Sequence, residues 1–212
     1  MKVIAVTGGI GCGKTAVTEY LTSRKYIVID ADQTAREAVL PGAGGLKALT
    51  DHFGESILHE DGSLNRKLLA DMVFSDSNKR KALNGILHER IIDIINRQIA
   101  DYLKAGLDIV FISAPLLIET GMHVIADEVW LVGADVDIRI NRVMNRDGLT
   151  KAEVIKRMDS QMNTMEKKDY AHVYIDNSDG LDELHHRIDI ELVRLACLMC
   201  EPKCEKNPRP SK

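Results

Sequence analysis

The feature that most restricts the fold of this chain is a glycine-rich stretch that directly follows a short apolar run. Residues 2–7 read KVIAVT, which is typical of a buried strand, and residues 8–15 read GGIGCGKT. The second stretch matches the pattern G-x-x-x-x-G-K-[ST], and a helical segment follows from Lys14 to about Arg24. In such a strand–loop–helix unit, backbone N–H groups surround a phosphate and the helix N-terminus favours the anion. The sequence therefore predicts a phosphate-binding loop.

The side chains of this loop have definite expected roles. We expect Lys14 to bridge the β- and γ-phosphates of a bound nucleotide and the Thr15 hydroxyl to ligate Mg²⁺. A plain glycine turn with a solvated lysine is the weaker interpretation, because the flanking strand and helix fit the motif. A helix N-terminus lowers a thiol pKa, so Cys12 has a redox interpretation. The favoured interpretation is a small residue whose backbone N–H binds phosphate.

Two other nucleotide-binding patterns are missing from the sequence. No G-x-G-x-x-G fits the loop, because the register that starts at Gly9 puts Lys14 where the last glycine belongs. This spacing disfavours a dinucleotide-binding fold. The guanine-specific motif N-K-x-D is also absent, which weakens the interpretation as a GTPase switch.

Continuous apolar runs predict four further strands, and helical patterns separate one from the next. The runs lie at residues 26–29, 109–112, 129–132 and 173–175. Apolar strands that alternate with helices are typical of a parallel sheet covered on both faces. The sequence thus predicts an α/β fold with a five-stranded parallel sheet.

One long stretch interrupts this alternation. Residues 41–106 carry no convincing strand, and apolar residues recur at helical spacing from Leu83 to Ile99. This periodicity predicts a long helix over about residues 76–104, which ends at Gly106. We interpret the stretch as a helical insertion between the second and third strands.

A second helical excursion follows the fourth strand, and a final helix closes the chain. Residues 150–153 read TKAE, a capping box, and Gly148 suits the end of the helix before it. The final helix has one apolar face, which consists of Leu181, Leu184, Ile188, Leu192, Leu195 and Met199. The polar tail from residue 202 is expected to fray.

Composition excludes several classes of protein. The 45% of apolar residues among 212 argues against a disordered chain, and the net charge of −4 gives no signal for nucleic acid or an anionic membrane. No apolar run is long enough to span a bilayer and no signal peptide is recognisable, so we expect a cytoplasmic protein. Four cysteines do not make a disulfide scaffold, and for Cys197, Cys200 and Cys204 we favour reduced thiols without a metal site.

Two aspartates follow the second predicted strand. Asp30 and Asp32 lie at the carboxyl end of that strand, which in a parallel sheet is the edge where ligands bind. A carboxylate there can accept a proton from an attacking hydroxyl or hold Mg²⁺ through water. The alternative is that one of them only caps a helix that begins near Ala35. The position favours a functional role for at least one.

An ordered set of short motifs resembles the dephospho-coenzyme A kinase family. The resemblance covers about residues 3–195 and is more specific than the phosphate loop, which many kinases share. Its segments are TGGIGCGKT at 7–15, IDAD at 29–32, DGSLNR at 61–66, ILH at 86–88, PLLIE at 115–119, RDGL at 146–149 with Arg157 and Gln161, and IDN at 175–177.

This resemblance implies transfer of the γ-phosphoryl group of ATP to the ribose 3′-hydroxyl of dephospho-CoA, the last step of coenzyme A synthesis. It implies a P-loop NTPase-type three-layer core formed by residues 1–40 and 107–200. Residues 41–106 would be a CoA-binding insertion, residues 136–168 a mobile lid, and residues 201–212 a flexible tail.

The resemblance also implies roles for individual residues. The catalytic set is Asp32, Lys14, Arg142 and Arg146, with Asp32 as the proposed base. The ATP-binding set is Gly9, Gly11, Cys12, Gly13, Lys14, Thr15, Ala16 and Asn177, with Thr15 toward Mg²⁺. The set that binds dephospho-CoA is Asp32, Arg66, His88, Leu116, Glu119, Arg157 and Gln161. ATP and dephospho-CoA are the expected small-molecule partners of a monomer or weak homo-oligomer that binds neither nucleic acid nor membrane.

The chain departs from the family pattern at two places. Ser113 stands where the family often has an aspartate, which places more of the Mg²⁺ shell on Thr15, phosphate oxygens, water and Asp32. Glu89 stands where a proline is usual, so the long helix is expected to be straighter.

Three arginines share one face of a predicted helix, because Arg139, Arg142 and Arg146 are spaced i, i+3 and i+7. Such a face suits a polyphosphate. We favour phosphate binding for Arg142 and Arg146, and a solvated position for Arg139. For His88, a substrate contact and a pairing role within the long helix stay equally open.

Two other functions remain as alternatives. A nucleoside or nucleoside-monophosphate kinase would share Lys14, Thr15 and Asp32 but lack the segments at 61–66 and 115–119. A nucleotide-dependent switch or binding module would bind ATP or GTP without phosphorylating an added acceptor.

Overall fold

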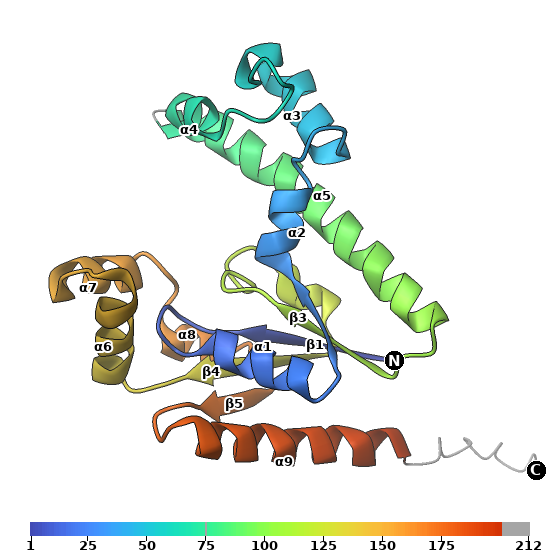
Figure 1. Ribbon diagram of the computed structural model, residues 1–212, viewed down its shortest axis with the longest axis vertical. Helices are drawn as coiled ribbons and strands as arrows, with labels where there is room; N and C mark the ends of the chain where they lie inside the picture. Colours follow the sequence, from blue (N-terminus) through green and yellow to red (C-terminus); the bar gives the residue numbers. More distant parts are fainter. Residues whose placement is uncertain (75, 201–212) are drawn as a thin grey trace, which may run out of the picture.

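The structure is a computed structural model that describes residues 1–74 and 76–200, apart from the side chain of residue 200. Within these residues, five parallel strands form one sheet in the order β2-β3-β1-β4-β5. The strands are β1 (Lys2–Thr7), β2 (Ile27–Asp30), β3 (Ile109–Ser113), β4 (Glu128–Gly133) and β5 (Val173–Asp176). The predicted α/β fold and its five-stranded parallel sheet are therefore confirmed (Figure 1). The expectation of a frayed tail concerns residues outside the described ranges.

The central strand β1 places the glycine-rich loop in the middle of the sheet. β1 pairs with β3 on one side and β4 on the other, with Ile4 opposite Phe111 and Glu128. Because all strands are parallel, the loop that follows β1 lies beside the carboxyl ends of its neighbours. Such an edge, where the strand order reverses, is the usual ligand site of an open α/β sheet.

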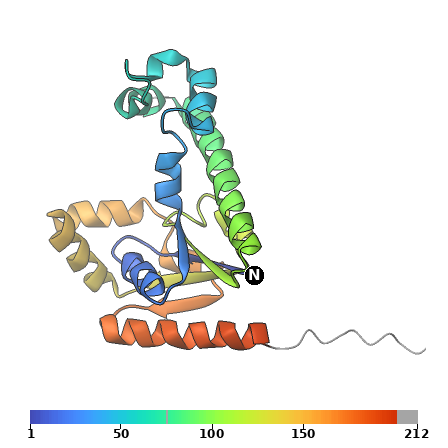
Figure 2. The same cartoon turned by 45° about the vertical axis from the view of Figure 1, so that its right-hand side comes forward.

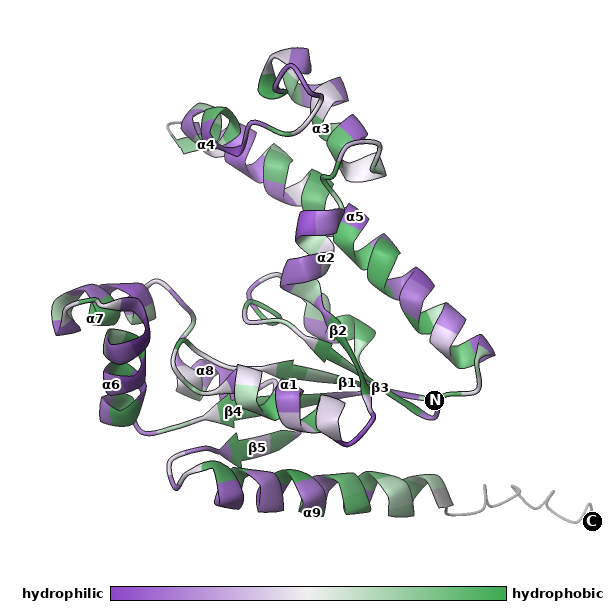
Figure 3. Cartoon of the chain, viewed as in Figure 1, coloured by the Kyte–Doolittle hydropathy of each residue, from purple (hydrophilic) through white to green (hydrophobic). Residues whose placement is uncertain are grey.

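The period of two along the strands sends alternate side chains to opposite faces. Ile4 and Val6 pack with α1 (Lys14–Ser23) and α9 (Leu181–Cys200) in one apolar cluster. Val3 and Ala5 pack on the other face with α5 (Ser77–Lys104). The sheet is thus the middle of three layers, and Figure 3 shows its hydrophobic strands enclosed by helices with mixed surfaces.

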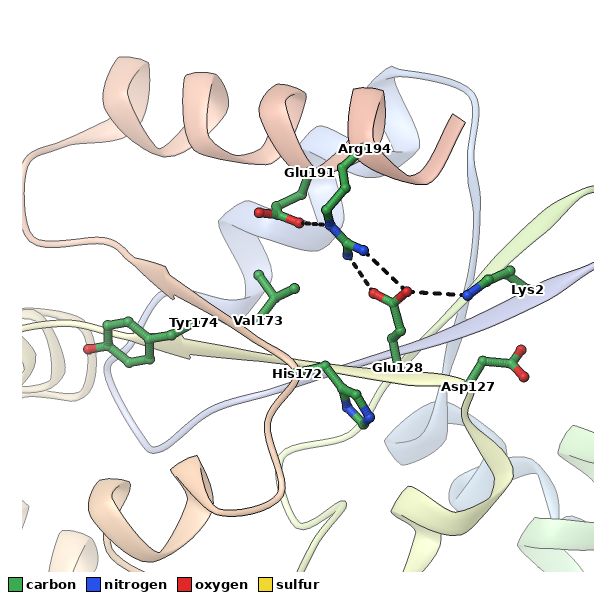
Figure 4. Close-up of a pocket in the computed structure, with 8 residues that line it drawn as sticks. All are labelled: Lys2, Asp127, Glu128, His172, Val173, Tyr174, Glu191 and Arg194. Atoms are coloured by element: carbon green, nitrogen blue, oxygen red, sulfur yellow. Dashed lines mark hydrogen bonds and ion pairs between the residues drawn. The ribbon is translucent and has the colours of Figure 1, made fainter. Parts of the chain in front are cut away.

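The final helix packs on the sheet through the central part of its predicted face. Leu184, Ile188, Leu192 and Leu195 are buried, whereas Leu181 and Met199 at the two ends are 59% and 37% exposed. An ion-pair network adds to this contact, because Arg194 on α9 binds the buried Glu128 at the start of β4, and Lys2 binds the same carboxylate at 3.4 Å (Figure 4).

The helical insertion has a small core of its own. It contains α3 (Gly44–Phe53), the 3₁₀ turn η1 (Glu55–Ile57), α4 (Arg66–Phe74) and the first half of α5. Its buried members form a cluster separate from the sheet, made up of Val39, Leu49, Ile57, Leu69 and Val73. Figures 1 and 2 show this part projecting away from the sheet.

The long helix α5 joins the insertion to the sheet. Asp76 caps it by accepting backbone N–H groups of Asn78 and Lys79, which explains why the helix begins at Ser77. Leu83 and Leu87 pack in the insertion, whereas Ile95 and its neighbours pack on the sheet. One helix is thus shared between the two regions.

The second excursion folds as three helices, α6 (Val136–Asp147), α7 (Lys151–Asp159) and α8 (Thr164–Lys168). The predicted capping box is present, with Thr150 and Glu153 bonded reciprocally, and Gly148 ends α6 with φ 68°. Ile140, Val143 and Val154 form a small cluster against Ile10 of the glycine-rich loop. We call α6, α7 and the following segment to residue 168 the lid region. None of the helices in the described part of the chain is long and apolar enough to cross a membrane.

Candidate active site

A cavity of about 540 Å³ opens at the carboxyl edge of the sheet. The whole glycine-rich loop, residues 8–15, forms one wall. Residues from three distant segments complete it: Asp32, Pro115, and the lid residues Arg142, Val143, Arg146 and Gln161. The sequence-predicted Lys14, Thr15, Asp32, Arg142 and Arg146 therefore face one cavity, together with the predicted glycines and Cys12.

The loop has the geometry of an anion cradle. Gly13 precedes α1 with φ 91°, in the left-handed region, and no side chain caps the helix. A Cβ at Gly13 would also collide with the amide of Asn177, so both the backbone angle and the lack of space require glycine at this position. The first N–H groups of α1 are thus left for a ligand. Ala16, a predicted ATP-binding residue outside the cavity lining, packs its side chain against the core.

The catalytic lysine candidate is held by the end of β3. The ammonium of Lys14 donates to the hydroxyl of Ser113 at 2.5 Å. Ser113 is buried at the point where the family pattern expects an aspartate. A neutral hydroxyl in this place orients the ammonium without neutralising its charge, which stays available for phosphate.

The two aspartates of the acidic pair have different roles. Asp30 caps α2 (Ala31–Glu37), because its Oδ1 accepts the backbone N–H of Asp32 at 2.8 Å and of Gln33 at 3.1 Å. This cap starts the helix at Ala31, so the expected start near Ala35 was wrong. Asp32 lies in the first helical turn, is exposed, and lines the cavity. The cap interpretation thus applies to Asp30, whereas Asp32 lines the cavity and does not cap the helix.

Arg139 was expected to be solvated, and this expectation was wrong. The residue is 7% exposed, and its Nε donates to the carbonyl of Ile10 at 3.0 Å. A second donor, Nη1, lies 3.3 Å from the hydroxyl of Thr164. The apolar neighbours Ile140 and Val143 bury this part of α6, and the guanidinium bonds to the loop backbone. Arg139 therefore holds the backbone of the glycine-rich loop through the carbonyl of Ile10.

The half-buried Arg142 and the buried Asn177 form a pair beside the loop. Arg142 Nη2 donates to the carbonyl of Asn177 at 2.9 Å, and Asn177 Nδ2 donates to the carbonyl of Cys12 at 2.9 Å. The other terminal nitrogen of Arg142 is buried and, within the described residues, has no hydrogen-bond partner. A buried guanidinium nitrogen that lines the phosphate cavity is suited to an anionic ligand.

Arg146 and Arg157 share one carboxylate at the outer end of the lid region. Arg146 donates to Asp147 at 2.7 and 3.0 Å, and Arg157 lies 3.4 Å from the same side chain. The hydrogen bond from Arg146 and the charges of both arginines lower the pKa of Asp147. Arg146 also lines the cavity, whereas Arg157 does not.

Other predicted substrate residues are engaged by the protein or lie elsewhere. Gln161 accepts the backbone N–H of Ile10 at 3.0 Å, and Glu119 forms an ion pair with Lys167 at 2.8 Å. Leu116 is 45% exposed beside Pro115. Arg66 is exposed at the start of α4, and His88 is half-buried on α5, both in the insertion and outside the cavity lining. Roles of these residues toward substrate stay predictions.

Sequence reasoning missed Lys167. Its side chain is only 1% exposed, and its ammonium reaches Glu119 and the carbonyl of Pro115. In the sequence it is one of two adjacent lysines in a polar stretch, so nothing marks it as buried. The capping box of Asn163 and Glu166 could have predicted the start of α8, but not the burial of this lysine.

Cys12 is placed for structure and not for redox chemistry. The thiol is 2% exposed, and burial raises its pKa despite the backbone N–H of Lys14 and the nearby cations. A raised pKa leaves little thiolate at neutral pH, which argues against a reactive cysteine. Cys197 is exposed, and the side chains of Cys200 and Cys204 lie outside the described residues.

The chain matches the family model described as dephospho-CoA kinase over residues 2–183. A dephospho-CoA kinase of Geobacter sulfurreducens is 41% identical over 189 residues, which cover 89% of this chain and 96% of that protein. One of Shouchella clausii is 37% identical, covering 91% and 98%.

Solved structures agree with this match. A crystal structure of a Thermus thermophilus protein superposes with a TM-score of 0.75 at 32% identity, covering 92% of this chain and 97% of that one. A dephospho-CoA kinase from Campylobacter jejuni gives a TM-score of 0.68 at 25% identity, covering 91% and 97%.

Proposed function

This chain belongs to the dephospho-CoA kinase family, and on that basis we propose that it transfers the γ-phosphoryl group of ATP to the ribose 3′-hydroxyl of dephospho-CoA. The products are coenzyme A and ADP, so the reaction completes coenzyme A synthesis. The observation that carries the proposal is one cavity that joins Lys14 and Arg142 of the phosphate side to Asp32. Phosphoryl transfer requires this combination of fixed cations and an acceptor-side carboxylate.

The phosphate side is proposed to hold and neutralise the triphosphate. Backbone N–H groups of residues 9–15 surround the β-phosphate, and Lys14 reaches across to the γ-phosphate. Arg142 and Arg146 approach from the lid region, where their charge stabilises the transferring group. The unpartnered nitrogen of Arg142 and the cavity-lining position of Arg146 support these roles.

Asp32 is proposed to receive the proton of the acceptor. The 3′-oxygen attacks the γ-phosphorus, the bond from that phosphorus to the β–γ bridging oxygen breaks, and ADP leaves. The proton of the 3′-hydroxyl passes to the carboxylate of Asp32 as the new bond forms. Exposure of Asp32 on the cavity, beside a neighbour that already caps the helix, supports this assignment.

The residues at the cavity also suit Mg²⁺. Magnesium prefers hard oxygen ligands and retains several waters. Thr15 presents a hydroxyl at the rim, and Asp32 presents a carboxylate, whereas Ser113 hydrogen-bonds Lys14. We therefore assign Thr15 as the direct ligand and Asp32 as a contact through water. The ion, when bound, would neutralise charge on the β- and γ-phosphates.

The insertion is proposed to recognise the rest of the acceptor. Residues 41–106 form a separate apolar cluster beside the cavity-bearing core, and they contain Arg66 and His88. We assign these two residues, with Leu116, Glu119, Arg157 and Gln161, to the dephospho-CoA side. We also propose a cytoplasmic monomer or weak homo-oligomer that acts on small molecules.

One experiment tests the proposal against both alternatives. ADP release is measured with Mg-ATP and either dephospho-CoA, AMP, adenosine or no acceptor, and coenzyme A is identified by mass. Turnover with dephospho-CoA alone is the expected result. Turnover with AMP or adenosine alone would indicate a nucleoside or nucleoside-monophosphate kinase. ATP binding without turnover of any acceptor would indicate a switch or binding module.

A further inference from the structure

A lysine outside the phosphate loop is buried with two oxygen partners. The side chain of Lys167 on α8 is 1% exposed, and its ammonium lies 2.8 Å from a carboxylate oxygen of Glu119 and 3.3 Å from the carbonyl oxygen of Pro115. A buried charge is tolerated only when such partners compensate it. Both partners belong to the loop after β3, so Lys167 anchors that loop.

The anchored loop forms part of the wall of the cavity that the lid arginines also line. Pro115 lines the cavity together with Asp32, the proposed base. Behind it, Leu117 and Ile118 are buried in the core, so the loop has little freedom once its carbonyl at 115 is fixed. The hydroxyl of Thr7 also lies 3.4 Å from that carbonyl. A shift of this wall would move the acceptor relative to Asp32.

The other end of the same segment holds the phosphate loop. Gln161 accepts the N–H of Ile10 at 3.0 Å, and Arg139 links the carbonyl of Ile10 to the hydroxyl of Thr164. The N–H of Met162 in addition donates to Glu119 at 3.3 Å. Residues 161–167 thus connect the loop that holds phosphate with the wall that faces the acceptor.

We propose that Lys167 is a positioning residue for phosphoryl transfer. Through Glu119 and the carbonyl of Pro115, it fixes the acceptor-side wall at a set distance from the phosphate loop. It contacts neither reacting group, so its effect falls on the placement of the acceptor and not on the binding of ATP. This inference rests on the proposed function, because it assumes an acceptor between Asp32 and Pro115.

The test must separate positioning from simple stabilisation of the fold. Lys167→Met leaves Glu119 without its buried partner and is expected to lower stability. The double variant Lys167→Met/Glu119→Met replaces the ion pair by two apolar side chains of similar length, which restores stability in many proteins. Because Glu119 is itself assigned to the dephospho-CoA side, Glu119→Gln, which keeps Lys167 and the shape of the side chain, measures the part of any kinetic change that comes from this carboxylate. Lys168→Met is the matched control, since Lys168 is exposed and lies over the ring of Tyr174.

Three quantities are measured for each variant: the melting temperature, the dissociation constant of ATP, and kcat/KM for dephospho-CoA with kcat and KM resolved separately. We expect the double variant to melt near the wild type and to bind ATP within about twofold. Its kcat/KM for dephospho-CoA is expected to fall about tenfold or more, because misplacement of a reacting group by 1 Å costs up to about a hundredfold in rate. Lys167→Arg is expected to recover part of this loss, and Lys168→Met to match the wild type.

Two results would overturn the inference. An unchanged kcat/KM in a stable double variant would make the ion pair purely structural, and an equal rise in the ATP dissociation constant would place the effect on the phosphate loop. Calorimetric binding of dephospho-CoA in the presence of ADP separates these outcomes from failure of the proposed function. If wild-type protein binds dephospho-CoA without turning it over, the proposed function fails. The dissociation constants of dephospho-CoA for the wild type and the double variant then still show whether Lys167 places this ligand. If it does not bind at all, both proposals fall.

Discussion

The phosphate-loop edge of the sheet and the helical insertion differ in what holds their side chains in place: contacts with distant segments at the edge, and local packing in the insertion. At the edge, a contiguous motif is fixed by distant segments, because Asn177 binds the carbonyl of Cys12 and Arg139 binds that of Ile10. The insertion instead packs on itself around Leu49 and Ile57, and it shares α5 with the sheet. In the proposed function, phosphate chemistry therefore belongs to the core, whereas recognition of the acceptor belongs to an insertion with an apolar cluster of its own.

This difference suggests that catalysis and acceptor recognition are separable. Substitutions at the edge should change the rate constant of a correctly folded protein. Substitutions in the core of the insertion should change acceptor affinity and local stability while ATP binding persists. Each of the following predictions tests whether catalysis and acceptor recognition are separable.

The largest effect is expected from Asp32→Asn. Loss of a general base costs about 10²- to 10⁴-fold in kcat, and a neutral amide cannot take the proton of the 3′-hydroxyl. The melting temperature should stay near that of the wild type, since Asp32 is exposed. Steady-state kinetics with saturating ATP and dephospho-CoA measure the effect.

Asp30→Asn is the matched control for this substitution. Asn caps helices about as well as Asp, so α2 should keep its start at Ala31 and the variant should stay close to the wild type in kcat. Equal losses in the two variants would show that the effect is not specific to Asp32 and would remove its role as the base.

Arg146→Ala should produce the next largest effect. Removal of one preorganised donor at developing charge costs about 10²- to 10³-fold in kcat, and part of that range is expected because Arg146 keeps contact with solvent and Asp147. Its exposed position predicts little loss of stability. Lys151→Ala changes another lid cation, which pairs with Asp137 outside the cavity lining, and serves as control. A loss of stability as large as the loss of rate would favour a structural role for Arg146.

A smaller effect on turnover is expected from Ile57→Ala in the insertion. Ile57 is fully buried, and truncation to Ala costs about 2–5 kcal/mol through lost contacts and the cavity left behind. Hydrogen exchange should increase in α3 and α4, and the KM for dephospho-CoA should rise.

ATP binding should persist in this variant, because the cluster of Ile57 is separate from the sheet. Ser56→Ala, at an exposed neighbour, is the control. A parallel loss of ATP affinity would contradict the independence of the insertion.

The two regions also differ in how far the sequence predicts them. The strand, loop and helix around Lys14 follow one another within the first 24 residues, so local pattern sufficed for the fold of the edge. The five strands, the capping box at Thr150 and the helical character of the insertion were predicted for the same reason. These features depend on the residues that form them and little on their neighbours in space.

The errors concern charged residues whose surroundings come from elsewhere in the chain. Arg139 was assigned to a solvated basic face, since only Arg142 and Arg146 match the family pattern, but tertiary contacts with Ile10 bury it. Lys167 was missed because its partners lie about fifty positions away, at Pro115 and Glu119. Spacing within a helix identifies which face a charge occupies, but it does not identify what packs against that face.

The smallest effect is expected far from both regions, at the amino ends of the strands, from Arg194→Met. Burial opposes ionisation of Glu128, but the hydrogen bonds and charges of Arg194 and Lys2 outweigh it and lower the pKa of the carboxyl (Figure 4). A carboxyl with a lowered folded-state pKa stabilises the protein above its ordinary pKa, and this contribution is lost as the pH falls through the folded value. The variant should therefore be less stable by about 1–2 kcal/mol at pH 7, since Arg194 is partly exposed and Lys2 remains.

The difference in stability between the wild type and the variant should shrink between about pH 5 and pH 3. Denaturant unfolding of both forms across this range measures it. A difference that stays constant to pH 3 would show that Arg194 acts through its packing on α9 and not through the charge of Glu128.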